Sequence, residues 1–153
     1  MFHQQPEGAR VMKKSFSKWM LTLAPILYMI LIWILSSMPA DAIINTPFSF
    51  DRLMKESLHL IEFGILYWLI ALALAAHQSW TVKASILAAV VSILYGATDE
   101  IHQFFVPYRS ATVIDLVKDA IGVLVSFYIM KITYFAKRPS FITSIFQKLN
   151  DAE

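Results

Sequence analysis

Four long apolar stretches, separated by short polar segments, dominate the pattern of the chain. Residues 19–40 contain no Asp, Glu, Lys or Arg over 22 positions, which is enough for a helix to cross a hydrocarbon core of ~30 Å. Three further stretches follow at residues 58–82, 84–104 and 113–135. This pattern predicts an all-α, polytopic membrane protein built as a four-helix transmembrane bundle.

The composition agrees with a location in a bilayer. Of the 153 residues, 58% are hydrophobic and 16% are charged, whereas soluble domains have ~25% charged residues. A net charge of only +2 argues against a nucleic-acid partner. Because the chain has no cysteine, disulfides, thiolate nucleophiles and Cys-ligated zinc are excluded.

The distribution of Lys and Arg predicts which side of the membrane each segment faces. Nine of these residues precede the first stretch, lie between the second and third, or follow the fourth, whereas Arg52, Lys55 and Arg109 occupy the opposite loops. Lys and Arg concentrate in cytoplasmic loops. Both termini are therefore predicted to be cytoplasmic in a multi-pass protein of the cell membrane. A cleaved signal peptide ending near Ala40 is the competing interpretation of the first stretch.

We expect three segments along the chain. They are a basic cytoplasmic segment at residues 1–18, a membrane domain at 19–136 and a cytoplasmic tail at 137–153. The tail places Phe141, Ile145 and Phe146 at helical spacing beside Lys148, which predicts an amphipathic helix on the inner membrane surface. A loose tail is the alternative.

Ionisable residues lie inside three of the four stretches, where each costs ~2.5 to ~3.5 kcal/mol at a helix centre. Such residues normally face the bundle interior and serve a function, although those in an outer turn can simply meet lipid headgroups. With the predicted topology they form one layer near the external face. The candidate binding residues are His59, Glu62, Asp99, Glu100, Gln103, Arg109, Asp115 and Asp119.

Helical spacing and three glycines predict how this layer is assembled. Residues three or four positions apart share a helix face, so each of three helices offers a short polar stripe. Gly64, Gly96 and Gly122 fall one per helix close to these stripes, and small residues let membrane helices approach closely. We expect the glycines to draw the helices together beneath the layer. We also expect Arg109 to fold back from its loop and pair with carboxylates of the third and fourth stretches.

An ordered set of motifs runs through the chain from about residue 20 to residue 130. It consists of Ser36-Ser37-Met38-Pro39, His59-x-x-Glu62, Asp99-Glu100-x-x-Gln103, Arg109 and Asp115-x-x-x-Asp119-x-x-Gly122. This set resembles the VanZ-like family of small bacterial membrane proteins. The resemblance implies a bacterial cell membrane and a link to low-level resistance to the glycopeptide teicoplanin, but it implies no reaction.

Three functions are compatible with the layer. The first is a binding module. It recognises either the polar headgroup of a membrane lipid, such as a lipid-linked cell-wall intermediate, or a glycopeptide. The alternative is an intramembrane enzyme that uses acid/base catalysis, alone or with Mg or Mn held by His59, Glu62, Asp99 and Glu100. A proton- or cation-coupled transporter is the third. The sequence assigns no cofactor and no metal, and the binding module ranks first.

Overall fold

Every regular element that the structure describes is a helix, as the sequence predicts. The computed structural model describes residues 7–38, 50–107, 109 and 111–150, with the side chains of 18–38, 60–107, 109 and 111–149. The elements are α1 (Glu7–Ser36), α3 (Phe50–Ala76), α4 (Val82–Phe104), α5 (Val113–Met130), the π-helix η1 (Lys131–Phe135) and α6 (Phe141–Asn150). Over the described residues the all-α prediction is therefore confirmed.

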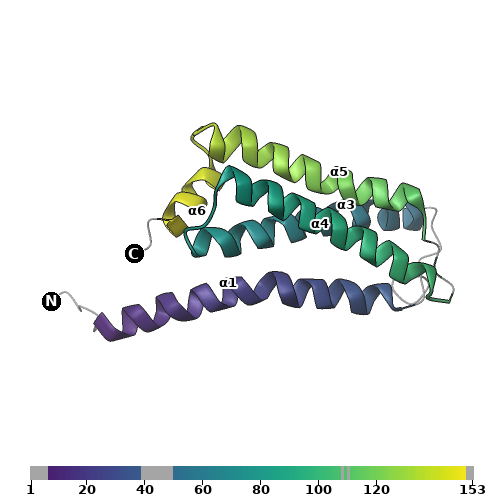
Figure 1. Ribbon diagram of the computed structural model, residues 1–153, viewed down its shortest axis with the longest axis horizontal. Helices are drawn as coiled ribbons and strands as arrows, with labels where there is room; N and C mark the ends of the chain where they lie inside the picture. Colours follow the sequence, from purple (N-terminus) through teal and green to yellow (C-terminus); the bar gives the residue numbers. More distant parts are fainter. Residues whose placement is uncertain (1–6, 39–49, 108, 110, 151–153) are drawn as a thin grey trace.

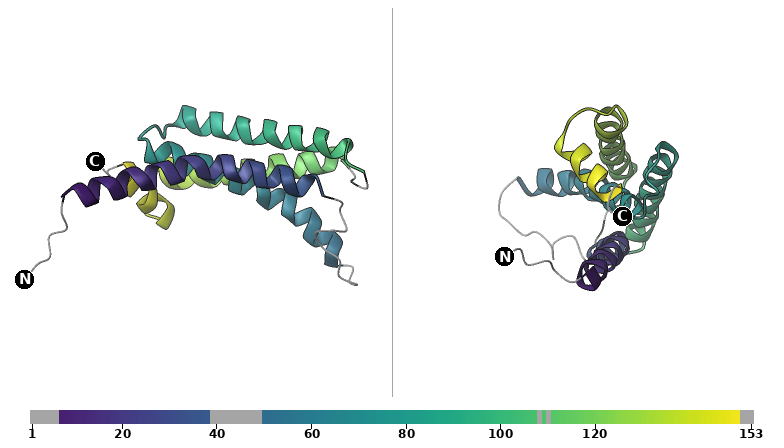
Figure 2. Two further views of the ribbon diagram at one scale, coloured as in Figure 1. Left: turned by 90° about the horizontal axis from the view of Figure 1, so that it is seen from below. Right: turned by 90° about the vertical axis from the view of Figure 1, so that its left-hand side faces the viewer.

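The four long helices lie side by side along the long axis of the molecule (Figure 1). Helix α3 contacts α1, α4 and α5, and α5 also packs on α4. The short helix α6 lies at the end of the bundle where α1 begins (Figures 1 and 2). The opposite end holds the end of α1, the end of α4 and the beginning of α5.

The helix boundaries differ from the predicted stretches at two places. Helix α3 ends at Ala76, and the backbone turns before Thr81, whose hydroxyl accepts a hydrogen bond from the Ala84 N–H at 3.2 Å. Thr81 therefore caps the N-terminus of α4, and Val82, expected to end the second stretch, begins α4 instead. Helix α1 begins at Glu7, within the segment expected to precede the membrane domain.

Two described helices are long and apolar enough to cross a membrane, at Lys18–Ser36 and Val82–Phe104. The apolar part of α3, Leu60–Ala76, is shorter. Helix α5 carries Asp115, Lys118 and Asp119 in its first two turns. The ionisable residues of the predicted layer thus lie on α3, on α5 and near the end of the long apolar helix α4.

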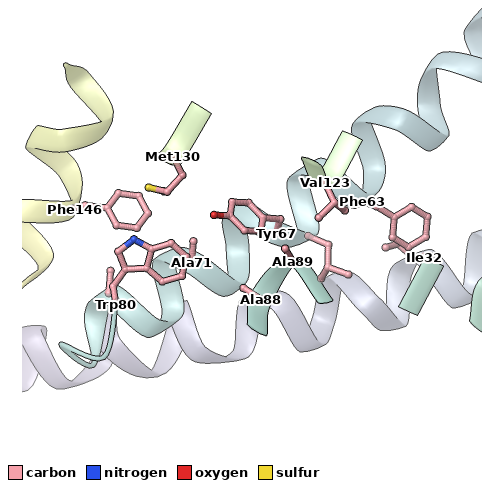
Figure 3. Packing of buried hydrophobic residues seen from close by; sticks show 12 residues of the cluster. Ile32, Phe63, Tyr67, Ala71, Trp80, Ala88, Ala89, Val123, Met130 and Phe146 are labelled. Carbon is pink, nitrogen blue, oxygen red and sulfur yellow. The ribbon is translucent and has the colours of Figure 1, made fainter. Parts of the chain in front are cut away.

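One continuous apolar core extends along the bundle. It begins with Phe146, Trp80 and Met130 near α6 and ends with Phe63 and Ile32 at the other side of the close-up (Figure 3). Alanines fill the middle of this core, and Ala71, Ala88 and Ala89 are buried where helices face one another. Small side chains at these positions allow the helix backbones to lie close together.

Glycines determine the closest helix contacts, as predicted. A Cβ atom at Gly122 of α5 would collide with the Leu60 carbonyl of α3. A Cβ atom at Gly64 of α3 would lie 3.1 Å from Ser126 Oγ and 3.3 Å from the Gly122 carbonyl oxygen. The crossing of α3 and α5 therefore depends on two glycines that face each other one turn from Leu60.

Helix α6 packs on the protein through a cluster of aromatic rings. The Phe146 ring is 1% exposed, and its centroid lies 5.4 Å from that of Tyr134 and 5.7 Å from that of Trp80. Phe141 on the same helix is 80% exposed. The predicted amphipathic helix is present, but its buried side covers α3 and η1. Phe146 thus packs on protein, and the location of the helix at the inner membrane surface stays a prediction.

Candidate functional site

A polar layer lies at the end of the bundle opposite α6. We define this layer as Ser36 of α1, Glu62 of α3, Asp99, Glu100 and Gln103 of α4, Arg109, and Asp115, Lys118 and Asp119 of α5. Its buried members include two acids with almost no exposed surface, Asp99 at 1% and Asp119 at 0%. Burying charged groups is costly unless they are paired, so the partners of these side chains decide what the layer can do.

Asp99 is the centre of a buried hydrogen-bonded cluster. Its Oδ2 accepts a hydrogen bond from Ser36 Oγ at 2.9 Å and another from Gln103 Nε2 at 2.7 Å. Gln103 Nε2 also reaches Ser36 Oγ at 3.3 Å. The second carboxylate oxygen, Asp99 Oδ1, is buried and has no hydrogen-bond partner in the structure. The cluster thus links α1 to α4 and leaves one acceptor atom unused.

Glu100 holds the loop after α4 against that helix. Its Oε2 accepts a hydrogen bond from the backbone N–H of Thr112 at 3.1 Å, and Thr112 is the residue that caps α5. One acidic side chain therefore joins the end of α4 to the beginning of α5. Glu100 is buried, so this bond is protected from competing water.

Asp119 lies against the backbone of α4. A Cβ atom at Gly96 would lie 3.2 Å from both Cβ and Oδ2 of Asp119. Gly96 is three residues before Asp99 and four before Glu100, so all three share one face of α4. The absence of a side chain at Gly96 is what allows the buried Asp119 to approach this face. The structure therefore brings Asp99, Glu100 and Asp119 together.

Asp115 has a structural role at the start of α5. Its backbone N–H donates to Thr112 Oγ1 at 3.1 Å, while Thr112 Oγ1 donates to Asp115 Oδ2 at 2.6 Å. Lys118 Nζ lies 3.0 Å from Asp115 Oδ1. An acid in the first turn also interacts favourably with the positive end of the helix dipole. Asp115 thus supports the Thr112 cap and has its own cation, which distinguishes it from Asp99.

Glu62 of α3 belongs to the layer. Glu62 lies close enough to the hydroxyls of Tyr28 and Tyr95 to interact with them electrostatically, and Asp99 does the same with Tyr95. The Tyr95 hydroxyl itself donates to the Met29 carbonyl at 2.6 Å. The side chain of His59, predicted beside Glu62, lies outside the described residues.

Among the described residues, the expected ion pair between Arg109 and the acids of α4 and α5 is not seen. Its backbone N–H donates to the Val106 carbonyl at 3.3 Å, which closes a turn after α4, and its Nε is buried without a hydrogen-bond partner. Among the described side chains of the layer, the carboxylate of Asp115 is paired with Lys118. Asp115 instead meets Lys118, which lies one turn away on the same helix.

Three contacts of the layer were not predicted. Ser36 was recognised only as part of a motif, yet its hydroxyl is the link from α1 to Asp99. The His102 ring stacks on Trp33 with centroids 3.9 Å apart, and its Nε2 lies 2.9 Å from Ser37 Oγ. Thr112, three residues before Asp115, has the spacing of a helix cap, which could have been recognised in the sequence.

The layer offers directional hydrogen bonding and net negative charge. Within the described part of the chain, no group of three or more His, Cys, Asp or Glu side chains is arranged to hold a metal ion. The described layer can accept a hydrogen bond through Asp99 and donate one through Arg109.

The described residues form an all-helical protein with two helices that are long and apolar enough to cross a membrane and with a buried acidic layer at one end of its bundle. Residues 13–134 match the model of the VanZ/LLP1 family. Because this match covers most of the chain, the protein belongs to the VanZ-like family. Comparison with curated proteins and with solved structures finds no match.

Proposed function

We propose that this VanZ-like protein crosses the bacterial cell membrane four times, with both termini in the cytoplasm. Helix α4 has 23 residues and is about 34 Å long at ~1.5 Å per residue, close to the ~30 Å of a hydrocarbon core. Large apolar side chains are exposed along the three helices that surround α3, including Leu23, Leu27 and Ile34 of α1, Leu87 and Leu94 of α4, and Ile121 and Leu124 of α5. Exposed apolar side chains in such numbers suit contact with lipid chains.

The absence of cysteine makes this topology directly testable. Ser79 and Pro107 are exposed and lie at opposite ends of α4. A membrane-impermeant maleimide added to intact cells should label a Pro107→Cys variant and should leave a Ser79→Cys variant unlabelled until the membrane is permeabilised. Labelling of Ser79→Cys in intact cells would reverse the proposed orientation.

The proposed activity is binding of a polar headgroup of the cell envelope, or of a glycopeptide, by the polar layer. The observation that carries this proposal is the buried Asp99 carboxylate, which is positioned by two hydrogen bonds and keeps Oδ1 available. A group that is positioned by its neighbours and retains an unused acceptor is suited to recognition. Reduced susceptibility to teicoplanin would follow if the bound molecule takes part in the action of the antibiotic.

Binding accounts for the core better than proton movement does. Between the layer and α6 the centre of the bundle contains apolar side chains such as Phe63 and Val123, and its buried polar groups include neutral hydroxyls such as those of Tyr67 and Ser85, which lie 2.7 Å apart (Figure 3). Proton relays in membrane proteins typically use chains of Asp, Glu or His side chains. The apolar core therefore favours a site that opens toward one side of the membrane.

Thermal-shift measurements on purified protein test the proposal. Candidate ligands are envelope lipids, glycopeptides and divalent cations, and the variants are Asp99→Asn and the neighbouring exposed Thr98→Ala. At least one lipid or glycopeptide should raise the melting temperature of the wild type and of Thr98→Ala but not of Asp99→Asn. If no lipid or glycopeptide stabilises the protein, or if Asp99→Asn responds like the wild type, the layer is not the binding site.

A further inference from the structure

Two buried polar atoms of opposite character remain unused in the layer. Asp99 Oδ1 is an acceptor without a hydrogen-bond partner, and Arg109 Nε is a donor without one. The Asp99 side chain is 1% exposed, and a buried group left without a partner loses the hydrogen bonds that water would supply. The acceptor needs a hydrogen-bond donor, and the donor needs an acceptor, which can be an anion. A molecule that carries both a donor and an anion therefore matches the pair.

The chain keeps these two atoms in one region. The segment that carries Arg109 leaves α4 at Phe104 and returns to it at Thr112, where the backbone N–H donates to Glu100. Glu100 is next to Asp99 in sequence. Arg109 thus lies in the middle of a short loop whose two ends are held at the last two turns of α4, the turns that contain Asp99.

We propose, resting on the binding function above, that the ligand is a phospholipid with a phosphoethanolamine headgroup. Its ammonium group donates to Asp99 Oδ1, and its phosphate accepts from Arg109 Nε. An ammonium group has three donors and needs an acceptor with negative charge, whereas a guanidinium matches phosphate geometry. The headgroup therefore satisfies both unused atoms at once.

The charge of the layer favours an amine over a purely anionic headgroup. The layer has five acidic members and two basic members, which are Glu62, Asp99, Glu100, Asp115 and Asp119 on one side and Arg109 and Lys118 on the other. A second anion without an accompanying cation would be repelled by these carboxylates. A zwitterionic headgroup adds one positive and one negative charge and leaves the net charge of the layer unchanged.

The surroundings of the layer favour a lipid over a free headgroup. Apolar side chains at the same end of α4 and α5 are strongly exposed, among them Ile101 at 64%, Phe104 at 73% and Ile114 at 67%. Acyl chains attached to the phosphate could pack on these side chains and add apolar contact area. The soluble compound phosphoethanolamine has no such chains and should bind more weakly.

A series of lipids tests the proposal on the wild-type protein alone. Binding is measured by native mass spectrometry or thermal shift for phosphatidylethanolamine, its monomethyl and dimethyl derivatives, phosphatidylcholine and phosphatidylglycerol. Methylation removes N–H donors while the positive charge is kept, so affinity should fall along the series by about tenfold or more in total. Equal affinity for phosphatidylethanolamine and phosphatidylcholine, or preference for phosphatidylglycerol, would overturn the proposal.

Variants assign the two ends of the headgroup. Asp99→Asn keeps the size of the side chain but removes its charge, and it should lower the affinity for phosphatidylethanolamine to that for phosphatidylcholine. Arg109→Gln should weaken both lipids by a similar factor, because both carry the phosphate. Thr98→Ala is the matched control on the exposed face of α4 and should retain the wild-type preference. A wild-type preference in Asp99→Asn would contradict the assigned contact.

The outcomes separate this inference from the binding function. If Asp99→Asn abolishes binding of another envelope lipid or of a glycopeptide while phosphatidylethanolamine shows no preference, the binding function holds and the headgroup assignment is wrong. If no envelope molecule binds in a manner that depends on Asp99, the binding function fails as well. Equal affinity for soluble phosphoethanolamine and the lipid would overturn the lipid as the source of the headgroup.

Discussion

Both ends of the helical bundle contain buried side chains, but those at one end are apolar and those at the other are charged. At the α6 end, the rings of Trp80, Tyr134 and Phe146 pack against one another. At the end with the polar layer, carboxylates such as those of Asp99 and Asp119 are buried. Apolar burial stabilises a fold, whereas burial of charge costs free energy unless it is compensated. The aromatic end therefore stabilises the fold, and the polar end, where buried charge costs free energy, is the end to which we assign the proposed binding function.

Each end contains a buried polar atom without a partner, and the difference between the two atoms supports this distinction. Trp80 Nε1 is such an atom at the aromatic end. It is a neutral N–H surrounded by aromatic rings, which can accept weak hydrogen bonds. Asp99 Oδ1 belongs to a carboxylate, whose need for a donor is stronger. The unused atom that points to a ligand is therefore the one at the polar end.

The largest effect is expected at the glycine where the backbones of α3 and α5 touch, close to the polar layer. A Gly122→Leu substitution places a side chain where the Leu60 carbonyl of α3 lies, so α3 and α5 cannot cross as they do. We expect failure to assemble, measured as loss of monodisperse protein in detergent. Ile121→Leu on the exposed side of the same helix is the control. Similar yields and melting temperatures for the two variants would show that the glycine contact is unimportant.

A smaller but still large effect is expected at the aromatic end. Phe146→Ala removes a buried ring and should lower the free energy of unfolding by about 3 to 5 kcal/mol, whereas Phe141→Ala on the exposed side of α6 should change it by less than about 0.5 kcal/mol. The melting temperature in detergent and the rate of proteolysis within α6 are the measurements. The comparison of the two ends predicts that the folded fraction of Phe146→Ala still binds its ligand. Loss of ligand binding without loss of stability would break the comparison.

An intermediate effect is expected for the hydrogen bond that joins α1 to Asp99. Ser36→Ala removes one of the two donors to the buried carboxylate and should cost about 1 to 3 kcal/mol. Ser37→Ala, at the exposed neighbouring position, should cost less than about 0.5 kcal/mol. In an Asp99→Leu background the cost of Ser36→Ala should shrink, because the two groups interact. A cost for Ser36→Ala that does not depend on residue 99 would argue against the bond.

The smallest effect is expected for the ion pair at the start of α5. Lys118 and Asp115 are 21% and 17% exposed at their side chains, so water partly screens the pair. Lys118→Met should lower the free energy of unfolding by about 1 kcal/mol or less, with a smaller effect at high salt. The measurement is the melting temperature across a salt series. A loss as large as that of Phe146→Ala would place the lysine among the stabilising core of the protein.

The apolar helices were predictable from local sequence alone. A stretch without Asp, Glu, Lys or Arg is apolar whatever its neighbours do, and bilayer thickness sets the length required. The end of α3 was predicted less well, because Val82 continues the apolar pattern after the turn at residues 77–81, and the Thr81 cap places Val82 in α4. The roles of Gly64, Gly96 and Gly122 were also predictable, since a residue without a side chain among bulky neighbours marks a close approach.

Side-chain partners were decided by the tertiary structure. Which carboxylate meets which donor depends on the rotation of each helix about its axis, and this rotation is determined by contacts such as that of Gly122 with Leu60. The link from Ser36 to Asp99 spans 63 positions, and no local pattern specifies it. The partner of α6 was undetermined for the same reason, because an amphipathic helix can place its apolar face equally on lipid or on protein. The sequence therefore determined which residues could form the layer, and the packing of the helices determined which donors the Asp99 carboxylate meets.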